Sequence, residues 1–217
     1  MDDHDPCRTG DMRTIRRDGE YELEIRRSRF LCALARADTE DAARAFIAGR
    51  RREHWGANHN CTAYVLGDRG DVQRSSDDGE PSGTAGLPML EVLRRRELTD
   101  TVAVVTRYFG GVKLGAGGLI RAYGNAVSAA VDELGVLERR ELLVVDVFAD
   151  YVLGGRLESD LRDSSLTVRD VAYADRVRIE VALPEADLPG FGVRLAELTG
   201  GRAEFEVRGT TVVEVEP

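Results

Sequence analysis

The sequence predicts an α+β protein with two domains. Alternating or continuous apolar stretches, typical of strands, are interspersed with segments whose apolar residues recur every three or four positions, as in helices. The charge changes along the chain: residues 138–217 hold 10 basic and 17 acidic residues, whereas the remainder holds 20 and 22. We therefore predict a disordered polar tail over residues 1–14, an N-terminal domain over 15–137 and a C-terminal domain over 138–217.

The N-terminal domain is expected to alternate strand pairs with single helices. Thr39 can cap a helix, the turn at 67–70 has the composition of a hairpin, and Gly135 can end a helix. Pro88 fits the first turn of a helix. In chain order the predicted elements are strands over 20–25 and 30–35, a helix over 40–52, strands over 61–66 and 71–75, a helix from 85–88 to 96, a strand over 102–109 and a helix over 118–134.

The C-terminal domain is expected to have the element order of a ferredoxin-like fold, βαββαβ. Asp150 can cap its first helix, and the glycines at 200 and 201 can end the second. The predicted elements are a strand over 142–149, a helix to 161, strands over 166–174 and 177–183, a helix over 188–198 and a strand over 203–215. This domain has no cluster of reactive side chains, so we interpret it as a binding or docking module.

Composition excludes several classes of protein. No stretch approaches the roughly 20 apolar residues of a membrane span, and the first residues lack the pattern of a signal peptide, so we expect a cytoplasmic protein without a membrane partner. Three cysteines without a C-x-x-C pair argue against disulfides and structural zinc, and Cys32 is expected in the core. His54, His59 and Cys61 do not have the spacing of a metal site. We therefore predict no metal and no cofactor, and a structural role for His59.

The net charge of −9 argues against a broadly basic nucleic-acid-binding surface. The segment from Thr101 to Val131 differs, because it holds three basic residues and no acid. One of these is Lys113, the only lysine among 30 basic residues. If the protein contacts phosphate, this segment is the expected place. The compact ammonium of Lys113 differs chemically from a planar guanidinium, so this residue could have a role that arginine would not fill; the alternative is a chance survival in an arginine-rich sequence.

A first motif lies between a predicted strand and a predicted helix, over residues 76–86. Its carboxylates (Asp77, Asp78 and Glu80) could order the loop or hold Mg²⁺, and the helix start at Ser82, Gly83 and Thr84 could bind an anion. Alternatively, the acids form a solvated turn and Ser82 or Thr84 caps the helix.

A second motif, over residues 106–121, is again a strand, a glycine loop and a helix start. Its glycines allow close approach of a ligand to the backbone, so it is predicted to bind an anion or phosphate; the alternative is a structural turn. It matches neither the P-loop pattern nor the usual dinucleotide-binding motif. The candidate binding residues are Arg107, Tyr108, Gly110, Gly111, Lys113, Gly115, Gly117, Gly118 and Arg121.

Both motifs resemble the signatures of the IMPACT family, in its bacterial YigZ branch, and residues 59–64 match a third, weaker block. The resemblance spans residues 53–127, and the acidic C-terminal domain is similar to the extra domain of that branch. It implies an N-terminal domain with the fold of domain four of elongation factor G. It also implies a ferredoxin-like C-terminal domain. Eukaryotic members regulate translation by restraining activation of a kinase of initiation factor two, and by analogy the bacterial branch is expected to bind RNA or the ribosome.

Three functions remain open from the sequence. The leading hypothesis is a non-enzymatic binding protein linked to translation, with RNA, the ribosome or a translation-related protein as its partner. The alternative is an enzyme or binding protein for a phosphorylated metabolite, using the glycine-rich loops with Lys113, Asp77 and Asp78. The third is a structural role for both motifs. The sequence indicates neither the ligand nor the oligomeric state.

Overall fold

A computed structural model describes residues 12–164 and 166–217. The chain forms two compact units. Unit 1 comprises the residues up to Arg139 together with Glu214–Pro217, and unit 2 comprises Arg140–Val213. The predicted tail at 1–14 lies mostly outside the described residues.

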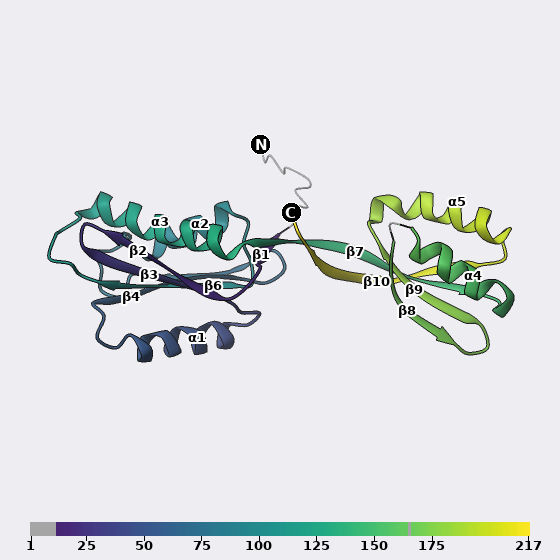
Figure 1. Ribbon diagram of the computed structural model, residues 1–217, viewed down its shortest axis with the longest axis horizontal. Coiled ribbons are helices and arrows are strands. Elements are labelled where there is room, and N and C mark those ends of the chain that lie inside the picture. The colour runs from purple at the N-terminus through teal and green to yellow at the C-terminus, as the bar shows by residue number, and fades with distance from the viewer. Residues whose placement is uncertain (1–11, 165) are drawn as a thin grey trace, which may run out of the picture. The chain divides into compact units, whose positions relative to one another are not determined.

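Unit 1 is a five-stranded antiparallel sheet with the order β2-β3-β6-β4-β5 and helices on both faces. Figure 1 shows α1 on one face and α2 and α3 on the other. The strands are β2 (Gly19–Ile25), β3 (Ser28–Arg36), β4 (His59–Leu66), β5 (Val72–Ser76) and β6 (Thr101–Tyr108). The helices are α1 (Glu40–Glu53), α2 (Gly86–Arg95) and α3 (Ala116–Leu134).

The core of unit 1 follows from the alternation of side chains along its strands. In β6, Ala103 and Val105 pack towards α2 and α3, whereas Val102 packs towards α1. The larger core contains Phe30 and Tyr123, both fully buried, with their rings edge to face at 5.3 Å. This alternation also sets the direction of Arg107, which lies two residues beyond Val105 and therefore on the side of α3.

One short strand was not predicted. β1 (Arg13–Ile15) pairs antiparallel with Val136–Glu138, at the start of β7 (Val136–Ala149). Arg13 and Thr14 were assigned to the disordered tail, but Thr14 is only 2% exposed in the structure. Three residues are too few to produce a recognisable alternation, which explains why this strand could not be predicted.

Unit 2 has the predicted order βαββαβ. It comprises the part of β7 from Arg140 onward, α4 (Tyr151–Arg162), β8 (Thr167–Tyr173), β9 (Val177–Leu183), the short 3₁₀ helix η1 (Glu185–Asp187), α5 (Leu188–Thr199) and β10 (Glu204–Val215). β9 pairs with β7 and β8, and β10 pairs with β7. The Asp150 side chain caps α4 by accepting a hydrogen bond from Leu153 N at 2.9 Å. The predicted α+β fold class is confirmed.

No helix in the described part of the chain is long and apolar enough to cross a membrane.

Candidate functional site

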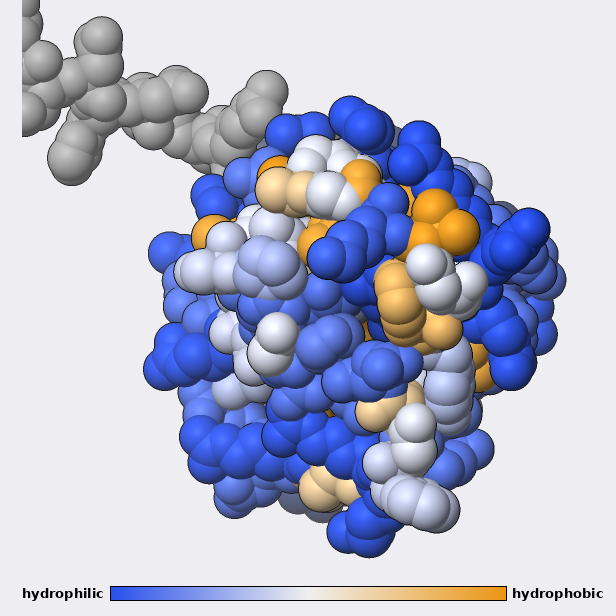
Figure 2. Space-filling model, turned by 90° about the vertical axis from the view of Figure 1, so that its left-hand side faces the viewer, coloured by the Kyte–Doolittle hydropathy of each residue, from blue (hydrophilic) through white to orange (hydrophobic). Residues whose placement is uncertain are grey.

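All candidate site residues lie at or beside one end of the unit 1 sheet. The register pairs Ile25 with Ser28, Tyr108 with Arg29, His59 with Arg107 and Ser76 with Thr62, so four connections leave the sheet at the same end. We call this end the loop end and define it by residues 26–27, 54–58, 77–85 and 109–115. Figure 2 looks onto it and shows mainly hydrophilic side chains with several hydrophobic ones among them.

The carboxylate of Asp77 anchors the start of α2 through hydrogen bonds. It accepts hydrogen bonds from Gly83 N at 2.8 Å, Ala85 N at 3.0 Å and Gly86 N at 2.8 Å. Burial raises the pKa of this carboxyl, but the backbone donors of Gly83, Gly86 and Ala85 together outweigh burial and lower it. The backbone donors predicted to bind an external anion therefore already bind a carboxylate of the protein itself.

Asp78 ties the same loop to β4 and α1. Its carboxylate accepts hydrogen bonds from Asn60 N at 2.7 Å and from the Arg51 guanidinium at 2.9 Å. Its carbonyl oxygen lies 2.9 Å from His59 Nδ1, so this nitrogen carries the proton and donates. His59 is therefore a hydrogen-bonded structural histidine, as expected. Among the described residues, no group of three or more His, Cys, Asp or Glu side chains is placed to hold a metal.

Glu80 and Arg107 form a buried ion pair. They are 8% and 5% exposed, and Arg107 Nη1 donates to Glu80 Oε1 at 2.5 Å. The Tyr123 hydroxyl donates to the same oxygen at 2.8 Å, and burial raises the pKa of this phenol. The Arg107 guanidinium also lies over the rings of Phe30 and Phe109. We expected Arg107 to contact phosphate, but β6 turns its side chain towards α3, where it binds Glu80.

Gly110 brings two connections of the loop end into contact. A Cβ atom at this position would lie 1.9 Å from the carbonyl oxygen of Arg27, in the turn between β2 and β3. The Gly110 amide also faces the Ser28 hydroxyl at 3.2 Å. Only glycine permits this approach. The glycine loop (residues 109–115) and the turn between β2 and β3 (residues 26–27, the basic turn) are therefore held side by side.

The remaining residues of the second motif surround the start of α3. Gly111 lies in the loop, Gly115 is the N-cap of α3, and Gly117 and Gly118 lie in its first turn. The Tyr108 hydroxyl, at the end of β6, lies 2.9 Å from His54 Nδ1. In the first motif, Ser82 is exposed, and the Thr84 hydroxyl donates to Pro81 O at 2.6 Å.

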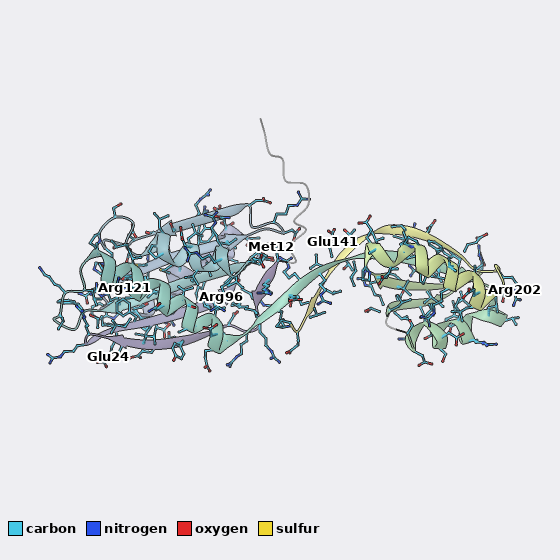
Figure 3. All side chains as sticks on the ribbon, turned by 90° about the horizontal axis from the view of Figure 1, so that it is seen from above. Met12, Glu24, Arg96, Arg121, Glu141 and Arg202 are labelled. Carbon is cyan, nitrogen blue, oxygen red and sulfur yellow. The ribbon has the colours of Figure 1, made fainter. Side chains whose placement is uncertain are left out.

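The loop end gathers basic side chains that have no acidic partner. Within residues 12–164 and 166–217, Lys113, Arg121, Arg26 and Arg27 are exposed and form no ion pair. Figure 3 labels Arg121, on α3, and Glu24, on β2, near this end of unit 1. Most other arginines form ion pairs, including Arg29 with Glu22 and Arg51 with Asp78. The unpaired charges therefore produce a local excess of positive charge in a unit with net negative charge.

A small pocket lies between the β2–β3 turn and α3. Its volume is about 220 Å³. Arg26, Arg121 and Asn125 supply its polar groups, and Ile25 and Leu114 supply apolar walls. Two guanidinium groups and an amide offer donors of the kind that bind a phosphate group.

The sequence alone missed three contributors to this end. Arg26 and Arg27 were not among the candidate site residues, because only the strand register places them beside the glycine loop. Asn58 was also missed: its side-chain oxygen accepts a hydrogen bond from Phe109 N at 2.8 Å. The antiparallel order of the strands, had it been known, would have identified all three.

Known proteins are similar to this chain over most of its length. The family model of the Impact N-terminal domain matches residues 26–131, and that of a domain of unknown function (DUF1949) matches residues 147–202. IMPACT family member YvyE of Bacillus subtilis (strain 168) is 46% identical over 201 residues, which cover 93% of each chain. This chain belongs to the IMPACT family.

Other members support the assignment. IMPACT family member YigZ of Escherichia coli (strain K12) is 39% identical over 84% of this chain and 90% of its own. A crystal structure described as that of a hypothetical protein is 35% identical, with a TM-score of 0.57 over 89% of this chain and 95% of that one. The Impact N-terminal model includes the β2–β3 turn and the glycine loop, so the loop end of this IMPACT family member lies within the region that matches.

Proposed function

We propose that this IMPACT family member is a non-enzymatic cytoplasmic binding protein, linked to translation, that contacts the phosphate backbone of RNA, free or in the ribosome. The contact surface is the loop end of unit 1. One observation carries the proposal: Arg26, Arg27, Lys113 and Arg121 lie at this end without acidic partners. Unpaired arginine and lysine side chains supply most of the affinity of proteins for nucleic acids.

The acids of the first motif are compatible with this proposal. Each carboxylate is already bound by donors of the protein, so it repels a polyanion less than a free carboxylate would. Asp77 binds backbone amides, Asp78 binds Arg51, and Glu80 binds Arg107. Each carboxylate is thereby held by donors of the protein, and the first motif orders the loop. The alternative, a metabolite enzyme that uses these acids with Mg²⁺, gains no support from this arrangement.

Sedimentation of the full-length chain in a sucrose gradient of cell lysate tests the proposal. We expect the protein to migrate with ribosomal particles at low salt and to leave them at high salt, since phosphate contacts depend on ionic strength. Lys113→Ala should weaken this association. Arg94→Ala is the matched control, because Arg94 is exposed, unpaired and near the C-terminal end of α2, away from the loop end.

Three results would contradict the proposal. Migration only at the top of the gradient at both salt concentrations would exclude stable binding to ribosomes. Association that persists in Lys113→Ala and survives digestion with ribonuclease would indicate a protein partner instead. Equal losses in Lys113→Ala and Arg94→Ala would show that the effect is general charge and not the loop end.

A further inference from the structure

The exposed large hydrophobic side chains of unit 1 gather at the same end as its unpaired bases. Within the described residues they are Trp55, Leu87, Phe109, Val112 and Ile120. Trp55 and Phe109 belong to loops that leave the sheet at this end, and Leu87 and Ile120 lie in the first turns of α2 and α3. A surface that combines exposed aromatic rings with unpaired cations is typical of proteins that bind single-stranded nucleic acid.

Trp55 is the most exposed aromatic side chain of unit 1, at 87%. It is also the only tryptophan of the chain. An indole is the largest side chain that a fold can bury, so leaving one in solvent forgoes the stabilisation that burial would give, and a binding function would explain its exposure.

The loop that carries Trp55 is fixed on both sides of the ring. His54 lies 2.9 Å from the Tyr108 hydroxyl and 2.8 Å from the Arg50 guanidinium. After the tryptophan, Asn58 N donates to Arg107 O at 3.0 Å, and Asn58 Oδ1 accepts from Phe109 N. These bonds tie residues 54–58 to the end of β6, so the exposed indole is presented by an ordered loop.

Phe109 supplies a second ring beside this loop. It is 45% exposed, and the Arg107 guanidinium lies 5.5 Å from its ring centre. Since neighbouring strands lie about 4.8 Å apart, β3, β6 and β4 place the basic turn, Phe109 and the Trp55 loop within roughly 10 Å of one another. That span suits contacts with two or three consecutive nucleotides.

We infer that the loop end binds a single-stranded segment of RNA, with bases stacked on Trp55 and Phe109 and phosphates bound by Arg26, Arg27, Lys113 and Arg121. This inference rests on the proposed function, which requires only phosphate contacts, and it adds the type of strand and the residues that meet the bases. A duplex keeps its bases stacked on one another and cannot offer their faces to the rings.

Trp55 makes the inference directly measurable, because all tryptophan emission of the protein comes from this residue. The full-length protein is titrated with a single-stranded RNA of about 12 nucleotides and with the duplex of the same sequence. We expect the single strand to quench the emission and the duplex to quench it far less. In parallel, Trp55→Leu should weaken binding of the single strand about tenfold, since the variant loses the stacking of a base on the indole ring.

The control variant is Tyr173→Leu, which removes an aromatic ring that is 59% exposed in unit 2. It should leave binding unchanged, and circular dichroism of both variants confirms that they fold. Equal affinity for single strand and duplex, with no loss in Trp55→Leu but a loss in Lys113→Ala, would overturn the stacking inference and leave the proposed function intact. Absence of RNA binding by the wild type would overturn both.

Discussion

Individual residues contribute strongly to the stability of the loop end, and Glu80 is one of them. Removing one partner of a buried ion pair leaves the other charge without compensation in the interior, so Glu80→Ala should lower the free energy of unfolding by about 3–5 kcal/mol. Denaturation in urea, followed by circular dichroism, measures this loss. Glu22→Ala is the control, since Glu22 and Arg29 form an exposed pair that contributes little. Equal losses of unfolding free energy in Glu80→Ala and Glu22→Ala would contradict the conclusion that burial makes the Glu80–Arg107 pair important for stability.

The contacts of Asp77 predict how the stability of the protein depends on pH. Its pKa is lower in the folded protein than in the unfolded chain, so the ionised carboxylate stabilises the fold above the unfolded value and this contribution is lost as the pH falls through the folded value. Asp77→Asn should therefore be less stable than the wild type at neutral pH. The difference should shrink below about pH 4. Urea denaturation at a series of pH values tests this, and a constant difference would contradict it.

Among the elements, the glycine loop depends on one close contact. Gly110→Ala would place a methyl group against the Arg27 carbonyl, so we expect a loss of about 1–3 kcal/mol in stability as the loop and the β2–β3 turn move apart. Gly117→Ala is the matched control from the same motif, because the nearest atom lies 3.8 Å from its added Cβ. That change should be neutral or stabilising by up to about 1 kcal/mol. Thermal denaturation compares the two variants.

The elements also show what the sequence could predict. Helices α1, α3 and α4 have capping residues and apolar stripes of sufficient length, so their positions followed from local patterns. β1 was missed because it is three residues long and owes its position to pairing with β7. Likewise, the motifs identified two of the loops that meet at the loop end, but the alternation that turns Arg107 inward and the register that adds Arg26 are properties of the assembled sheet.

At the scale of the whole molecule, charge limits how tightly a polyanion can bind. Unit 2 holds 9 arginines against 14 acids, a net charge of −5, so it would repel RNA, and the proposed binding would depend on a few local contacts in unit 1. Four phosphate contacts with a single strand predict that log K falls against log salt with a slope of about −3. Fluorescence anisotropy of labelled RNA between about 50 and 200 mM salt measures the slope.

Two single-residue variants test which side chains contribute to this slope. Lys113→Ala should make the slope shallower by about 0.7, and Arg69→Ala, an exposed and unpaired arginine in the β4–β5 turn, should leave it unchanged. A slope near zero would mean that the interaction is not with phosphate.

Unit 1 is discontinuous in the sequence, because residues 214–217 return to it after unit 2, and this has a consequence for biosynthesis. Glu214 accepts hydrogen bonds from both terminal nitrogens of Arg36, at 3.1 and 2.8 Å, and Glu216 binds Arg16 at 2.8 Å. The two partners of each contact stand on opposite sides of unit 2 in the sequence. A growing chain therefore cannot make these contacts until all of unit 2 has been translated, and unit 1 is completed only after unit 2 has been synthesised.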